Sequence, residues 1–237
     1  MTHSLDLAQL KLRQAAIEIR YDNAYTLWDR AGRIWSRASS EWSNLKMIEA
    51  APNITKFILN DRMELQVKLD RAHLIDLKAS SSLKEFIEIA EIFVDIVAIS
   101  LDISRFTRLG FRLTYYKNFP DKASAANVLL ACKKLVVPEG KHFNIQGKVL
   151  LPRYSLLWEG ESTAIQVTFA AQDRKIELDI SPGIEELESV HMEKHEIVYD
   201  IDYYTLNHIS KGQLNVKDWI EQTYHLIKRD SRVFMGV

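Results

Sequence analysis

The sequence lacks the residues that several common chemistries require. It has one cysteine, Cys132, so it can form neither an intramolecular disulfide nor a cysteine-based zinc site. Its eight glycines are scattered singly, so no glycine-rich loop can cradle a phosphate. A Gly-x-Ser-x-Gly nucleophile turn is absent as well. These absences exclude phosphate-loop nucleotide enzymes and serine hydrolases of that type.

The sequence also lacks an excess of charge and a long hydrophobic run. Its 31 basic and 32 acidic residues give a net charge of −1, so there is no surplus of cations for binding a phosphate backbone, although a local basic face stays possible. Charged residues interrupt the most apolar stretch, 86–101, which is therefore not a membrane span. The first residues do not have the pattern of a signal peptide. We expect a cytoplasmic protein that does not bind membranes.

What the sequence does have is a clear strand at its centre, within residues 105–119. Apolar residues alternate there with polar residues and glycine, which is the pattern of a strand with one buried face. The apolar positions are Leu109, Phe111, Leu113 and Tyr115, and the opposite positions are Arg108, Gly110, Arg112 and Thr114.

The elements follow a similar order on both sides of this strand. Periodicity and turn residues predict helices over about 83–101, 121–136 and 215–234. An earlier helix carries an apolar stripe of Trp28, Ala31, Trp35, Ala38 and Trp42. We expect the other strands over 16–21, 55–60, 63–70, 73–79, 143–158, 164–171, 175–180 and 196–205.

This order predicts an α+β protein with two similar β-α-β(3-4)-α halves, residues 1–104 and 105–237. We expect the halves to be tightly joined, as two units or as a single domain, and to share one antiparallel sheet covered on one face by helices. Such an arrangement would be TATA-binding-protein-like or helix-grip-like. A tandem ferredoxin-like fold is the alternative, but it needs fewer strands in the second half.

Two segments carry a resemblance to a known family. Arg108-Leu-Gly-Phe-Arg112, followed by Tyr115-Tyr116, resembles the Arg-x-Gly-x-Arg-Tyr strand of a sporadically distributed, uncharacterised bacterial family. Tyr199-Asp-Ile-Asp-Tyr-Tyr204 resembles that family's Asp-Ile-Asp-x-Tyr strand before its closing helix. The family's Pro-Pro pair before the first strand is missing here. The resemblance implies no activity and no catalytic residues, and the sporadic distribution suggests a mobile bacterial defence or toxin–antitoxin-type system.

Two carboxylates are the first candidate metal ligands. Asp200 and Asp202 lie on the same side of a predicted strand, roughly 6–7 Å apart, and could hold a divalent ion in a nuclease or hydrolase. Asp179 is a candidate third ligand. The alternative is a polar surface, or ion pairs with Arg108 or Arg112.

A second candidate metal site lies in an acidic region. His191 and His195 would share a face if they were on a helix, although Met192 occupies the position of a metalloprotease glutamate. The alternative is a solvated loop or helix. Lys194 is the only basic residue between Glu177 and Asp202, so this region could dock a basic partner or a second copy of the chain.

Two basic clusters are candidate binding surfaces. Arg30, Arg33 and Arg37 share one face of the first helix, while Arg108 and Arg112 belong to the central strand. Each cluster could bind nucleic acid or an acidic partner, or could be a solvated surface.

We predict a non-enzymatic protein–protein interaction module without a cofactor, with a protein partner or a second copy of the chain as its ligand. This hypothesis predicts an exposed apolar patch or a symmetric contact. The alternatives are a nucleic-acid binder that uses the sheet face or the first helix, a metal-dependent nuclease or hydrolase centred on Asp200 and Asp202, and a carrier with a closed apolar cavity.

Overall fold

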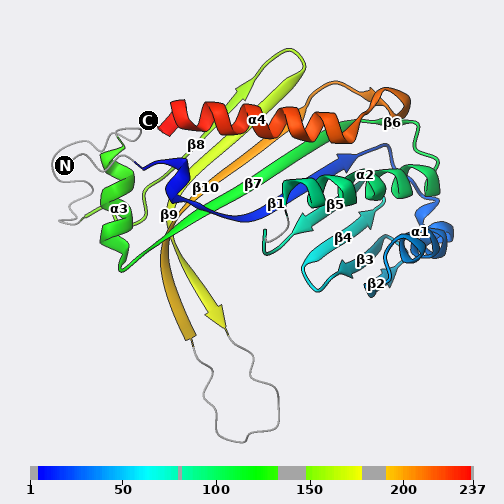
Figure 1. Cartoon of the computed structure of the whole chain (residues 1–237), viewed down its shortest axis with the longest axis horizontal. Coiled ribbons are helices and arrows are strands. Elements are labelled where there is room, and N and C mark those ends of the chain that lie inside the picture. The colour runs from blue at the N-terminus through cyan, green and yellow to red at the C-terminus, as the bar shows by residue number, and fades with distance from the viewer. Residues whose placement is uncertain (1–4, 80–81, 133–147, 178–190, 236–237) are drawn as a thin grey trace, which may run out of the picture.

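The computed structural model describes residues 5–79, 82–132, 148–177 and 191–235. It is a mixed α+β structure in which the described residues form a nine-stranded antiparallel sheet, a small two-stranded ladder and four α-helices (Figure 1). The strands of the large sheet lie in the order β2-β3-β4-β5-β1-β7-β10-β9-β8.

The described residues of the first half of the chain form five strands and two α-helices. Strand β1 is followed by a helix and by a meander that begins at the outer edge of the sheet and returns to pair with β1. Asn60 and Asp61 both have positive φ, so they form the tight turn expected between β3 and β4. The elements are β1 (Lys11–Arg20), α1 (Leu27–Glu41), β2 (Leu45–Ala51), β3 (Ile54–Leu59), β4 (Met63–Lys68), β5 (Arg71–Asp76) and α2 (Leu83–Ser100).

The second half has a similar order. Strand β7 is followed by a helix and a meander whose last strand, β10, pairs with β7. The elements are β6 (Arg105–Phe106), β7 (Arg108–Phe119), α3 (Lys122–Ala131), β8 (Arg153–Glu159), β9 (Thr163–Glu177), β10 (His191–Thr205), β11 (Ile209–Ser210) and α4 (Val216–Met235). Short 3-10 turns precede β1 and α4, and β11 pairs with β6.

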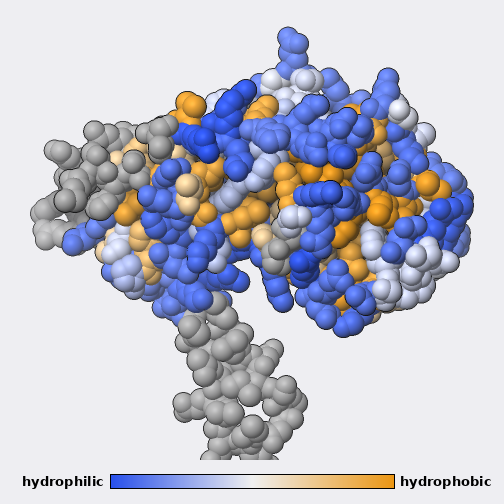
Figure 2. All heavy atoms as spheres, viewed as in Figure 1, coloured by the Kyte–Doolittle hydropathy of each residue, from blue (hydrophilic) through white to orange (hydrophobic). Residues whose placement is uncertain are grey.

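The core lies between the sheet and the helices. Directly paired residues form a fully buried row across five strands, which is what the alternating pattern predicts for the helix-facing side. This row consists of Phe57, Leu65, Leu74, Ile17 and Phe111. Helices α2 and α4 contact each other over this face. Their outward surfaces are hydrophilic, and apolar residues show in the gaps between them (Figure 2).

Side-chain caps fix where three helices begin. The Ser82 hydroxyl accepts a hydrogen bond from the backbone N–H of Glu85 at the start of α2. Asp121 does the same for Ser124 at the start of α3, and Asn215 caps α4. Each cap satisfies a backbone donor that has no partner within its helix, as expected for these residue types. The positions of α2 and α4 and the start of α3 therefore agree with the sequence prediction.

Three local predictions were wrong. Strand β2 was not expected, and β9 is continuous where two strands were expected. On α1 the buried residues are Leu27, Ile34 and Ala38, whereas Trp28 of the predicted stripe is 68% exposed.

Strands β9 and β10 continue beyond the rest of the sheet. Residues 174–177 of β9 and 191–194 of β10, which we call the arm, pair only with each other among the described residues. The arm projects from the body of the molecule (Figure 1). In the part of the chain that the structure describes, no helix is both long and apolar enough to cross a membrane.

Candidate functional site

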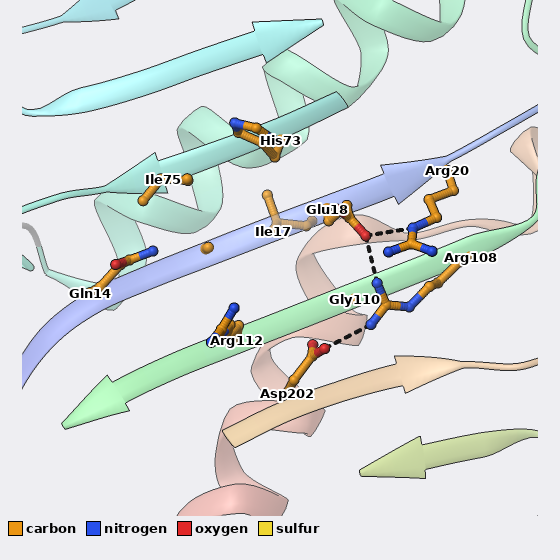
Figure 3. Close-up of a pocket in the computed structure, with 11 residues that line it drawn as sticks. Gln14, Ile17, Glu18, Arg20, His73, Ile75, Arg108, Gly110, Arg112 and Asp202 are labelled. Atoms are coloured by element: carbon orange, nitrogen blue, oxygen red, sulfur yellow. Dashed lines mark hydrogen bonds and ion pairs between the residues drawn. The ribbon is translucent and has the colours of Figure 1, made fainter. Parts of the chain in front are cut away.

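The side of the sheet that points away from the helices carries mostly polar residues, and we call it the polar face. Strand alternation places Glu18 of β1, Gly110 of β7 and Tyr204 of β10 opposite one another in adjacent strands. Arg112 and Asp202 are paired in the next row. Figure 3 views this face, with helices behind the strands.

Arg108 is the centre of the polar face. Its guanidinium donates to Glu18 at 2.5 Å and to Asp202 at 2.8 Å, which links three adjacent strands (Figure 3). The guanidinium carbon lies 4.1 Å from the centre of the Tyr204 ring, at cation–π distance. A Cβ at Gly110 would lie 3.5 Å from that carbon, an ordinary van der Waals distance, so the guanidinium lies directly over residue 110. Arg108 is thus a largely buried cation between two carboxylates and an aromatic ring.

Arg112 forms a second ion pair on the same face. Its Nε and Nη2 atoms donate to the two oxygens of Asp200 at 2.8 and 2.7 Å, and Thr114 adds a third hydrogen bond to this carboxylate at 2.8 Å. The hydrogen bond to Asp200 raises the pKa of the Arg112 guanidinium. Arg112 is 55% exposed, whereas Arg108 is 16% exposed, so water screens the Arg112 pair more strongly.

A polar hollow of about 200 Å³ lies between these groups (Figure 3). Burial raises the pKa of Asp202 although Arg108 opposes this effect. Burial likewise lowers the pKa of His73, which lines the hollow from β5. Arg20 also pairs with Glu18, at 2.7 Å, so the charged groups of the hollow largely neutralise one another. The side chains that line the hollow could form hydrogen bonds with a small polar ligand.

A further ion pair on the polar face involves a fully buried glutamate that the sequence analysis did not single out. Both guanidinium Nη atoms of Arg13 donate to Glu196, and Gln172 donates at 2.9 Å. Burial favours a higher pKa for Glu196, but these hydrogen bonds outweigh it and the pKa is lowered. Glu196, Asp200 and Asp202 are separated by even numbers of residues, so strand alternation places them on the same face of the sheet. This spacing could have identified Glu196 from the sequence.

The structure brings together some predicted site residues and separates others. Asp200 and Asp202 meet Arg112 and Arg108, which is the ion-pair alternative weighed for the two aspartates. Asp179 lies outside the described residues.

The arginines of the first helix are separate from the polar face, because α1 contacts α2 and β2. Arg30 pairs with Asp102 and donates to the carbonyl oxygen of Ser100. Arg33 is exposed and Arg37 is half-buried.

The two histidines lie in a strand rather than in a helix or loop. Residues 191 and 195 of β10 are roughly 13 Å apart along the strand, so they are not one helical turn apart as the metal-site hypothesis assumed. Most of the acidic region lies outside the described residues.

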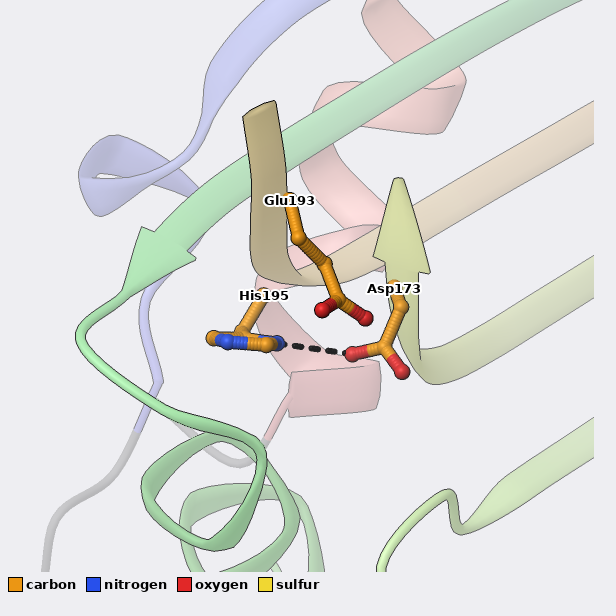
Figure 4. A group of neighbouring side chains, drawn as sticks. All are labelled: Asp173, Glu193 and His195. Carbon is orange, nitrogen blue, oxygen red and sulfur yellow. Dashed lines mark hydrogen bonds and ion pairs between the residues drawn. The ribbon is translucent and has the colours of Figure 1, made fainter. Parts of the chain in front are cut away.

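His195 instead belongs to a cluster at the base of the arm (Figure 4). Its Nδ1 lies 2.7 Å from an Asp173 oxygen, and Glu193 completes a group whose ligand atoms are all within 4.8 Å of one another. Three such side chains could ligate a divalent metal. However, the Lys122 ammonium from α3 lies 2.5 Å from Asp173 and 3.6 Å from Glu193 and supplies a cation itself.

The outer edge of the sheet at β8 is apolar. Leu156, Leu157 and Trp158 are 43%, 55% and 46% exposed, and the apolar residues of 149–151 just before the strand are exposed as well. Beside Trp158 a groove of about 360 Å³ runs between the sheet and α4. We call residues 149–158 and this groove the apolar edge.

The chain matches no protein-family model and no curated protein. The segments that carried the bacterial-family resemblance, 108–112 and 199–204, include the arginines and aspartates of two ion pairs, Arg108–Asp202 and Arg112–Asp200. The polar face and the apolar edge are therefore the features that bear on its function.

Proposed function

We propose that the protein is a non-enzymatic protein–protein interaction module that binds its partner through the apolar edge. The observation that carries this proposal is a seven-residue edge strand with three large exposed apolar side chains in succession. An exposed apolar edge strand is a template for pairing with another chain. Aromatic and aliphatic side chains of this kind dominate the energy of protein interfaces.

The opposite edge of the sheet supports this choice by contrast. Strand β2 also exposes apolar side chains, but it carries Lys46 and Glu49 and has a register shift between Met47 and Glu49. Charges and bulges of this kind protect an edge strand from pairing. Strand β8 is regular along its whole pairing with β9, and its charges stand only at its two ends, Arg153 and Glu159.

The groove beside β8 adds a place for an anchoring side chain. Trp158 and Phe234 meet edge to face, with ring centroids 5.9 Å apart. Val233 of α4, at the same groove, is 74% exposed. A partner strand laid along β8 would bring its side chains against these residues and remove them from water.

The proposal is tested by affinity capture from native cells with two matched variants. Leu157→Lys places a charge in the apolar edge, and Ile48→Lys makes the same change on β2, where the side chain is 57% exposed. A partner protein should be retained by the wild type and by Ile48→Lys but lost with Leu157→Lys. Equal retention by all three proteins would contradict the proposal.

Nucleic-acid binding by the polar face or α1 is a second candidate, favoured by the exposure of Arg33 and Arg112. Against it, the four arginines at the centre of the polar face all pair with carboxylates, which leaves little charge to displace counterions. Retention on DNA or RNA that falls with salt and is lost in Arg33→Glu or Arg112→Glu would favour this candidate.

We further propose that residues 1–104 and 105–237 are duplicated halves in a TATA-binding-protein-like or helix-grip-like arrangement. In support, each half runs strand, helix, meander and helix, and the first strands, β1 and β7, are neighbours. Fragments 1–104 and 105–237, when co-expressed, should assemble into a complex with the circular dichroism spectrum of the intact chain. Failure to associate would contradict the proposed boundary.

The sporadic distribution of the resembling family alone supports a role in a mobile bacterial defence or toxin–antitoxin-type system, and the sequence pattern at the N-terminus supports the cytoplasm as its place. An effector gene next to this one in several genomes would support that role, and unrelated neighbours would argue against it.

A further inference from the structure

We propose that the β8 strands of two copies pair antiparallel around a twofold axis at Leu156, which makes the protein a homodimer. This inference rests on the proposed function, since it uses the same apolar edge, and it names a second copy of the chain as the partner. Backbone geometry allows this register, and side-chain order and charge select it.

The backbone groups of β8 that point away from β9 are those that this register requires. Ala171 donates to the Pro152 carbonyl at 2.9 Å, and Gly160 donates to the Thr163 carbonyl at 2.9 Å. Because hydrogen-bonding direction alternates along an antiparallel strand, even-numbered residues from 152 to 160 point their backbone groups toward β9. The backbone groups of residues 153, 155, 157 and 159 therefore point outward.

A twofold axis at Leu156 places residue 153 opposite residue 159 of the second copy, and residue 155 opposite residue 157. Each outward-pointing residue then meets another outward-pointing residue, which gives about eight backbone hydrogen bonds over the paired strands. A shift of one residue would pair outward groups with inward groups and lose these bonds.

The charges of β8 are complementary in the same register. Arg153 at one end faces Glu159 of the second copy, and the symmetry repeats this pair at the other end. Both side chains are exposed, and neither forms an ion pair with another described residue. In a twofold contact the same surface of each copy has to fit the other. Arg153 and Glu159 meet this requirement, because they have opposite charges and each lies three residues from Leu156.

The apolar side chains fall into matching positions too. Tyr154, Leu156 and Trp158 project to the helix side, where Leu156 meets its own copy and Trp158 meets Tyr154 of the second copy. Leu157 lies opposite Ser155 on the other side. The pairing therefore covers the three most exposed apolar residues of β8 without burying a charge at its centre.

Disulfide trapping tests the register directly. In a Cys132→Ala background, Leu156→Cys would place two thiols in a non-hydrogen-bonded pair with Cα atoms about 4.5 Å apart, within disulfide range. Mild oxidation of the purified protein should link most of it into dimers. Leu157→Cys is the matched control, because the two copies of residue 157 would be about 9 Å apart, beyond that range.

Charge reversal tests the ion pairs. Arg153→Glu and Glu159→Arg should each weaken dimerisation about tenfold in sedimentation experiments, since each replaces two attractive pairs with two repulsive ones. An equimolar mixture of the two variants should form heterodimers as tight as the wild type, because every facing pair is again opposite in charge. No recovery in the mixture would overturn the proposed register.

The outcomes separate this inference from the proposed function. A purified wild type that stays monomeric at its highest soluble concentration overturns self-pairing, but the apolar edge could still bind a different protein in the capture experiment. Equal cross-linking at positions 156 and 157 overturns the register. A dimer that persists unchanged in Leu156→Lys overturns β8 as the contact.

Discussion

Arg108→Met should destabilise the protein by about 2–3 kcal/mol at neutral pH. The substitution keeps an apolar stem over Gly110 but removes the cation that joins β7 to Glu18 and Asp202. Removing one partner of a fully buried ion pair costs about 3–5 kcal/mol, and the partial exposure of these carboxylates reduces that figure. Glu18 keeps Arg20 as a partner, so most of the cost falls on Asp202.

The loss should depend on pH in a definite direction. Burial already raises the pKa of Asp202 above its ordinary 3.8, and without Arg108 the pKa rises further. A carboxyl group whose pKa is higher in the folded state than in the unfolded state stabilises the fold while it is protonated. This stabilisation is fully present below the unfolded pKa and is lost as pH rises through the folded pKa. The gap between the wild type and Arg108→Met should therefore be largest at neutral pH and shrink as pH falls toward 4.

Urea unfolding followed by circular dichroism measures this gap. Arg112→Met is the matched control, because its pair with Asp200 is more exposed and should be worth only about 0.5–1 kcal/mol. A double-mutant cycle with Asp202→Asn should give a coupling energy above about 1 kcal/mol. Equal losses for the two arginine variants, or a gap that does not vary with pH, would refute the reasoning.

Three further predictions concern other buried or paired groups. Glu196→Gln should cost about 2 kcal/mol at pH 7, because it removes the charged partner of Arg13. The lowered pKa of Glu196 stabilises the wild type above the ordinary pKa of 4.5, so the variant should lose less stability than the wild type as pH falls below about 4.5. Thermal melts across pH measure both effects. Ser231→Ala should cost about 1–2 kcal/mol in urea unfolding, since it leaves the buried Tyr199 hydroxyl without its 3.0 Å partner, and adding Tyr199→Phe should recover part of this. Magnesium or manganese should leave the Tm unchanged because both β10 aspartates are held by arginines, whereas a Tm that rises with metal concentration would revive the metal-site hypothesis.

Strands with one buried face were the most predictable elements. In β7 the alternation of Leu109, Phe111, Leu113 and Tyr115 is strong because all four side chains are buried against the helices. Strand β2 was missed because only Leu45 of its seven residues is buried, so an exposed edge strand leaves no alternating pattern. On α1 the size of the tryptophans hid the buried positions Leu27 and Ile34, which lie one residue away from the predicted stripe.

The polar face was only partly predictable for a different reason. Alternation identified Arg108, Arg112, Asp200 and Asp202 as members of one face, but not which charges meet. That depends on the register between strands far apart in the sequence, such as β1 and β7. The importance of Glu196 follows from its burial under Arg13, which local sequence does not reveal.

The arm adds a separate level of stability to the molecule. An isolated pair of strands is marginally stable in water. Among the described residues, Lys122 of α3 forms ion pairs with Glu193 in the arm and with Asp173 at its base. The amide hydrogens of the arm should therefore exchange with solvent by local opening, at rates far above those of the central strands, whose exchange requires global unfolding. Lys122→Ala should speed exchange in the arm and leave β7 unchanged, because we expect these strands to open and close while the rest of the protein stays folded.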